Sequence, residues 1–157
     1  MIRYADIRDA LSDLIKVEAG LPLKVFFNHV NDASESYALV SLRLERRDLG
    51  FGWFEHRVRT DIVIHLAPKM PGAEIRASDL YEIAERLDVA SLHAIPIADR
   101  HITILDTKFV VFDGLGTWSC VLDFSDYYAE LPEREKAEFM RELHLNLEQK
   151  KIDSRRI

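Results

Sequence analysis

The chain has 157 residues, of which 48% are hydrophobic and 31% are charged, a composition typical of a globular protein rather than a disordered one. Its net charge is −6 and its pI is about 5.5. Because phosphate contacts need clustered Lys and Arg, this acidic balance disfavours DNA binding, and we expect no sequence-specific nucleic-acid partner. Cys120 is the only cysteine, which excludes an intrachain disulfide and fits a reducing compartment.

The N-terminal residues and the longest apolar stretches indicate where in the cell the protein is made. Residues 1–6 contain no apolar core of a signal peptide. No stretch approaches the roughly 20 apolar residues that a membrane-spanning helix needs. We therefore expect synthesis in the cytoplasm and no membrane partner.

The chain opens with a predicted helix. Its apolar residues recur at the spacing of one helical stripe: Ile7, Ala10, Leu11, Leu14 and Ile15. Gly20 and Pro22 end this pattern. Residues 23–30, rich in Val and Phe, then predict a strand, and residues 31–34 a loop.

A long β-hairpin is predicted over residues 37–66. Its first strand alternates, with Ala38, Val40, Leu42 and Leu44 on one face. Its second strand begins at Trp53 and places on one face Val58, Thr60, Ile62, Ile64 and Leu66. Residues 48–52 supply turn chemistry. Because an isolated two-stranded hairpin is marginal in water, we expect its distal part to need a partner surface.

A helix, a second hairpin and a last helix are predicted downstream. Ser78 is the expected N-cap, and Asp79 suits the positive end of a helix whose apolar stripe is Leu80, Ile83, Ala84 and Leu87. Residues 102–112 and 117–127 form the second hairpin, in which one face carries Trp118, Cys120, Leu122 and Phe124. Pro132 suits the first turn of a final helix, with an apolar stripe of Phe139, Met140, Leu143 and Leu147.

These elements predict an α+β fold, with an antiparallel or mixed β-sheet, flanking helices and the order α-β-β-β-α-β-β-α. No repeat or linker divides residues 1–149, which we expect to form a single domain. The basic tail 150–157 has little apolar surface to bury, so we expect it to be disordered in the free subunit.

No motif in the sequence predicts a catalytic, metal or cofactor site. None of the six histidines forms the His-x-x-x-His pair of a zinc-binding helix. His56 and His65 are separated by an odd number of residues on one predicted strand, which places them on opposite faces. Cys120 lies on an apolar strand face, where a cysteine usually packs as a small hydrophobe.

A nuclease-like domain is one alternative interpretation. Asp106-Thr107-Lys108 has the acid-x-Lys form with which restriction-type nucleases hold Mg²⁺ and activate water. The match lies outside the first hairpin, however, and three-residue matches arise often by chance. A small intracellular binding module is the other alternative.

The polar face of the first hairpin is a candidate subunit interface. It mixes charges of both signs at Arg43, Glu45, Arg47, Arg57, Arg59 and Asp61. Such a face fits either solvent exposure or an interface in which opposite charges fix the register. Trp53 and Phe54, near the hairpin turn, fit either the aromatic anchors common at interfaces or side chains that fold back onto the core.

Several stretches resemble the small tail terminator, or tail completion, proteins of siphophages and prophages. They are residues 59–68, RTDIVIHLAP; residues 74–87, EIRASDLYEIAERL; and residues 110–115, VVFDGL, before an alternating strand that ends at Asp126-Tyr127. The likeness covers roughly residues 5–128, and the final helix and tail extend beyond the shorter members of the family.

The resemblance implies a non-enzymatic protein of the virion tail, made in the cytoplasm of a bacterial host. Members form a hexameric ring that caps the completed tail tube and joins it to the head. The implied partners are therefore other copies of this chain, the tail tube protein and head–tail connector proteins, with no cofactor.

Overall fold

The computed structural model describes residues 1–31, 33–92 and 94–128. Along the chain these form α1 (Tyr4–Asp13), a π-helical continuation η1 (Leu14–Glu18), β1 (Lys24–Phe27), β2 (Tyr37–Gly50), β3 (Trp53–His65), α2 (Ala77–Ser91), β4 (Ile95–Ile97), β5 (Arg100–Ile102), β6 (Ile104–Phe112) and β7 (Leu115–Tyr127). The α+β class is confirmed. Within the described ranges, no helix combines the length and the hydropathy needed to cross a membrane.

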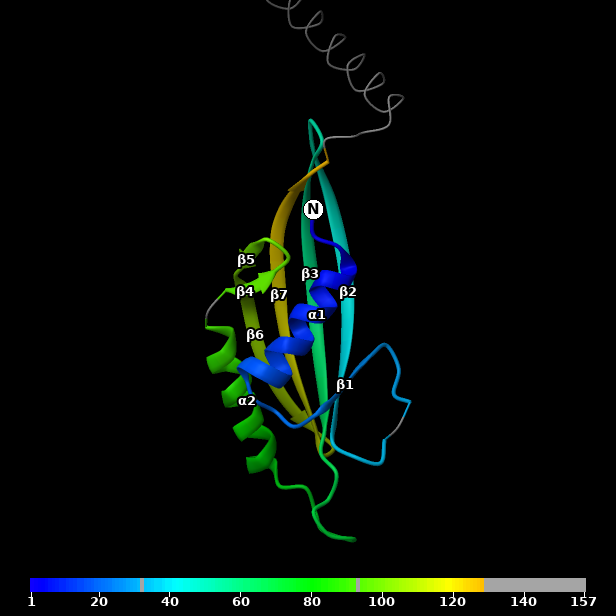
Figure 1. The fold of residues 1–157 in the computed structure, drawn as a ribbon. Coiled ribbons are helices and arrows are strands. Elements are labelled where there is room, and N and C mark those ends of the chain that lie inside the picture. Colours follow the sequence, from blue (N-terminus) through cyan, green and yellow to red (C-terminus); the bar gives the residue numbers. More distant parts are fainter. Residues whose placement is uncertain (32, 93, 129–157) are drawn as a thin grey trace, which may run out of the picture.

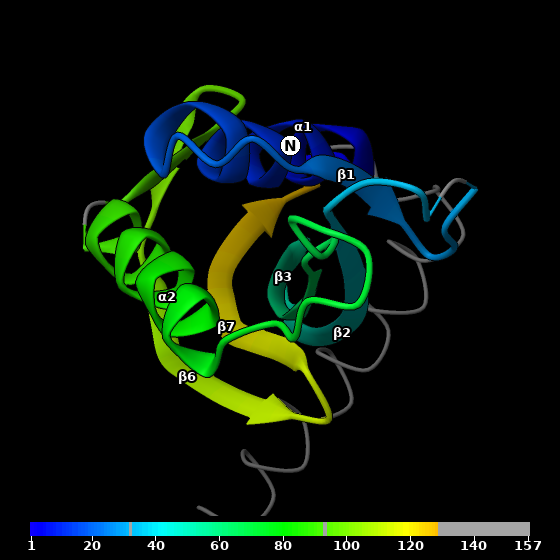
Figure 2. The same cartoon turned by 90° about the horizontal axis from the view of Figure 1, so that it is seen from below.

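One mixed sheet organises the fold. Its strand order is β1-β2-β3-β7-β6, and only β1 and β2 run parallel, while β4 and β5 form a separate hairpin. Figure 2 shows the sheet curling strongly, with α1 and α2 on its concave side. The convex side, here called the outer face, carries no helix in the part of the chain that the structure describes.

The core lies between the concave side of the sheet and the two helices. The predicted inward faces are confirmed at Val40, Val58, Ile62, Trp118 and Leu122, which are all fully buried. Leu44, on the predicted apolar face of β2, is instead 52% exposed. Burying such aliphatic and aromatic side chains is the main stabilising contribution to a domain of this size. The Trp118 indole N–H donates to the Asp88 carboxylate at 2.7 Å, which satisfies its polar atom and ties β7 to α2.

The first hairpin is confirmed, but one expectation about it is wrong. β2 and β3 pair from Tyr37↔His65 to Gly50↔Trp53, around a turn in which Phe51 has φ +55°. β7 pairs with β3 from Ile64↔Gly116 to Trp53↔Tyr127, at the turn end of the hairpin. The distal part is therefore three-stranded and does not need a partner to complete an isolated hairpin. Figure 1 shows it extending beyond α1 at one end of the molecule.

Three local predictions need correction. α2 begins at Ala77 with Arg76 as N-cap residue, so Ser78 lies inside the helix and does not cap it, although Asp79 does occupy the first turn. β1 ends at Phe27 because Asn28 adopts φ +70°, a left-handed conformation incompatible with a strand. The β4–β5 hairpin was not predicted, and β6 starts only at Ile104. The last helix and the tail 150–157 lie outside the described residues.

Candidate functional site

The outer face carries a charge-balanced ladder across three strands. In register along β2, β3 and β7 stand the rows Ser41-Asp61-Ser119, Arg43-Arg59-Val121, Glu45-Arg57-Asp123 and Arg47-Glu55-Ser125. Four arginines and four carboxylates thus lie on this face, and most of these side chains are exposed. The sequence had placed Arg43, Glu45, Arg57, Arg59 and Asp61 on one face, and the register confirms this.

Within the ladder, opposite charges pair across strands. The Arg59 Nε lies 3.3 Å from the Glu45 carboxylate, and the Arg57 Nε lies 3.7 Å from the Asp123 carboxylate. The Ser119 hydroxyl donates to Asp61 at 2.6 Å. Arg43 stands directly opposite Arg59, and cross-strand like charges are unfavourable. The charges of the face therefore balance in number, and an added carboxylate would be stabilising beside Arg43, where two arginines face each other across the strands.

The aromatic residues near the turn divide between the two faces. Trp53 is 47% exposed on the outer face and packs against Tyr127, which is 52% exposed, with ring centroids 5.2 Å apart. Phe54 points to the concave side, where Arg46 lies over its ring at 4.7 Å and Tyr128 meets it edge-on. Trp53 and Phe54 therefore lie on opposite faces of the sheet, because consecutive strand residues alternate.

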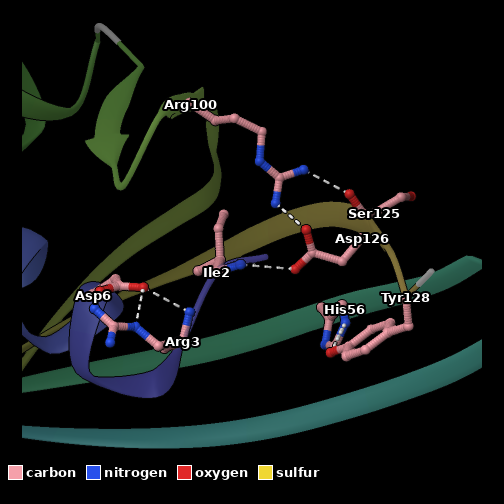
Figure 3. A network of polar contacts seen from close by, with 8 residues as sticks. All are labelled: Ile2, Arg3, Asp6, His56, Arg100, Ser125, Asp126 and Tyr128. Carbon is pink, nitrogen blue, oxygen red and sulfur yellow. Dashed lines mark hydrogen bonds and ion pairs between the residues drawn. The ribbon is translucent and has the colours of Figure 1, made fainter. Parts of the chain in front are cut away.

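A buried carboxylate ties the N-terminus to the end of β7. Figure 3 shows Asp126 between the backbone of Ile2 and the guanidinium of Arg100. Its side chain, 4% exposed, accepts from the Ile2 N–H at 3.1 Å and from Arg100, whose other nitrogen donates to the Ser125 carbonyl at 2.6 Å. Asp126 thus links the residues before α1 to β5 and β7, and the sequence offered no sign of this contact.

His56 occupies the concave side near the same place. Its ring stacks on Phe124 with centroids 5.2 Å apart, and its Nε2 lies 3.4 Å from the Tyr128 hydroxyl. Burial lowers the pKa of His56, with Arg46 and Arg100 adding to the decrease and Asp126 opposing it. His65 lies on the other face of β3, stacked on Tyr37, as the odd spacing predicted.

The structure gathers no metal ligands in the described residues: no group of three or more His, Cys, Asp or Glu side chains could hold an ion there. Asp106 and Lys108 are exposed, and Asp106 sits at φ +51° within a β-bulge. Asp106 lines a hollow with Asp61, but Arg43 and Arg59 line it too, and their positive charge disfavours a divalent cation there.

Cys120 and a groove beside α2 offer little chemistry. Burial raises the pKa of the Cys120 thiol to about 12, so it has almost no thiolate at neutral pH. A groove of about 850 Å³ lies between the start of α2 and segments 21–23 and 66–76. The groove is lined by three basic residues, Lys69, Arg76 and Arg86, and three acidic residues, Glu74, Asp79 and Glu82. Its lining therefore favours neither an anionic nor a cationic ligand.

Comparison with known proteins places the chain in no family. No protein-family model matches the sequence, and no curated protein matches it. Among several solved chains that match, one, whose name describes no activity, is similar with a TM-score of 0.41 and 16% identity, over 80% of this chain and 94% of that chain. At this TM-score the likeness carries no information on function.

Proposed function

We propose that this protein is a structural subunit of the tail terminator type, which assembles head to tail into a closed ring, most simply a hexamer, at the end of a phage tail tube. It acts by geometry and carries out no reaction. Its partners are other copies of itself, the tube protein and head–tail connector proteins, and its place is the virion tail after synthesis in the bacterial cytoplasm. The proposal starts from the resemblance of residues 5–128 to that family.

The observation that carries the proposal is the outer face together with its exposed aromatic end. A surface with equal numbers of interleaved arginines and carboxylates has no net charge to attract nucleic acid or a strongly charged ligand. It can, however, match another protein surface of the same mixed character, where complementary charges set the register. A second copy of this chain is the simplest source of such a surface.

The exposed aromatics supply apolar area for such a contact. Trp53 is 47% exposed and Phe51, at the turn, is 67% exposed. Covering the exposed half of a tryptophan removes about 120 Å² from water, which corresponds to about 3 kcal/mol per contact at the usual area coefficient. Contacts of this kind that repeat with a closing rotation generate a ring, whereas the same contacts without closure generate a filament.

Microscopy of the full-length protein tests this function. The protein is purified, concentrated and imaged by negative stain alone and after mixing with tail tubes, with native mass spectrometry of the same samples. We expect rings alone or at tube ends, and a mass that is a whole multiple of the subunit. A strictly monomeric protein at high concentration that also leaves tube ends bare would rule out the assignment.

A further inference from the structure

The five-stranded sheet is open, and its two edge strands are β1 and β6. Figure 2 shows these two strands at the two ends of the curled sheet. Within the described residues, no backbone hydrogen bond joins β6 to any element other than β7. The backbone donors and acceptors on the other side of β6 can therefore pair with an added strand.

The second half of β6 lacks the features that usually protect a sheet edge. Natural edge strands are blunted by prolines, by charged side chains or by bulges. The bulge at Asp106 interrupts the first half of β6, but residues 108–112, KFVVF, pair regularly with β7 and contain a single charge, Lys108. Val110 is 46% exposed and Phe112 is 81% exposed. This apolar half of β6 therefore suits the addition of a strand.

The opposite edge of the same sheet offers a matching strand. β1 runs parallel to β2 and β6 runs in the opposite direction, so a second copy rotated about an axis along the strands brings its β1 antiparallel to β6. Two different edges also provide the two different surfaces that a head-to-tail contact requires. We propose that residues 109–112 of one subunit pair antiparallel with β1 of the next subunit. This contact rests on the ring proposed above and adds to its outer-face contact.

The side chains of the two segments fit one register. Its four cross-strand pairs are Phe109–Phe27, Val110–Phe26, Val111–Val25 and Phe112–Lys24. Each pair joins side chains of the same sheet face, since the second and fourth lie on the outer face and the others on the concave side. Aromatic and β-branched neighbours stabilise such a ladder, and no like charges face each other in it. A shift by one residue would oppose the two faces, and a shift by two would bring in either Pro22 or Asn28, which has φ +70°.

Disulfide trapping in the full-length chain tests the inference. The variant K24C/F112C places one thiol on each sheet edge at an exposed position, and the native Cys120 is buried and does not compete. The matched control M70C/F112C moves the first thiol to Met70, which is 72% exposed and lies on neither edge strand. Circular dichroism first checks that both variants are folded. Both are then oxidised with glutathione disulfide at high protein concentration, and the covalent products are resolved by non-reducing electrophoresis.

Edge pairing predicts that K24C/F112C forms a ladder of covalent oligomers at least about tenfold faster than the control, because pairing raises the effective concentration of the two thiols. Rings in the wild type together with equal rates in the two cysteine pairs would overturn the inference and leave the ring standing. Rapid covalent dimers of the single variant F112C would also overturn it, because β6 would then pair with β6 of a second copy. A wild type that stays monomeric and leaves tube ends bare would contradict the proposed function, and the inference with it.

Discussion

Replacing Asp126 by Asn should destabilise the protein far more than its conservative size suggests. The Asp126 side chain is 4% exposed and accepts from two donors, the Ile2 N–H and the Arg100 guanidinium. An Asn oxygen can serve one donor, but its NH₂ group then faces the other, so a charge-assisted hydrogen bond is lost and a donor is left unpaired. Hydrogen bonds to charged groups contribute about 1.5–3 kcal/mol each.

The size of the destabilisation by D126N depends on how far water can replace the hydrogen bonds that are lost. Arg100 is 32% exposed at its side chain, so water can partly replace its lost partner. We therefore expect D126N to lower the free energy of unfolding by about 2–3 kcal/mol, or Tm by roughly 5–10 °C. Arg100→Ala should be milder, at about 1–2 kcal/mol.

Urea and thermal unfolding followed by circular dichroism measure these differences. The matched control is Asp123→Asn on the same strand, whose partner Arg57 is 3.7 Å away and 47% exposed, and which should cost under about 0.5 kcal/mol. A D126N variant no less stable than D123N would refute the view that this buried carboxylate fastens the N-terminus to β7.

Three further predictions concern single residues near the sheet. Gly52→Ala should destabilise the protein by about 1 kcal/mol or more beyond the effect of Gly114→Ala. Both glycines have positive φ, but only a Cβ at Gly52 would approach a neighbouring atom, the Tyr128 carbonyl oxygen at 2.8 Å. Urea unfolding of both variants measures the difference. Because the folded-state pKa of His56 lies below its ordinary value, the unfolded chain binds more protons there, so stability should be full above about pH 6.5 and fall as the pH drops from there to the folded-state pKa. His56→Gln should reduce this dependence of the unfolding free energy on pH, measured by urea unfolding between about pH 5 and 8. An unchanged pH dependence would show that other groups cause it. Cys120, with its pKa of about 12, should not react with an aromatic disulfide reagent at pH 8 in the native protein and should react in urea, and rapid native labelling would show that its site opens.

Local patterns predicted the strands and helices that face the core. Val58, Thr60, Ile62 and Ile64 are all fully buried because strict alternation leaves only one face that a half-buried strand can turn inward. The stripe Leu80, Ile83, Ala84 and Leu87 is buried for the same reason at helical spacing. The three-residue strands β4 and β5 were missed because so short a segment carries no measurable period.

The candidate interface was only partly predictable. Alternation on β2 and β3 placed Arg43, Glu45, Arg57, Arg59 and Asp61 together, and the same alternation, applied to Trp53 and Phe54, would have separated those two residues. Asp123 and Tyr127 joined the outer face through β3–β7 pairing, whose register depends on residues about 70 positions apart in the sequence. The contact of Asp126 with Ile2 joins residues 124 positions apart, and no local pattern could predict it.

Light scattering on a matched pair of variants tests the central proposal of a ring built through the outer face. W53A/R57E removes an exposed apolar side chain and reverses a charge beside Asp123 and Glu45, and M70A/K69E makes the same kinds of change at two exposed residues of the 66–76 segment. Circular dichroism first confirms that both variants are folded. We predict that at high concentration the wild type and M70A/K69E assemble to the same mass, whereas W53A/R57E stays monomeric. Assembly of all three proteins to the same mass would show that the ring does not use this face, and a monomeric wild type with no ring at tube ends would contradict the proposed function itself.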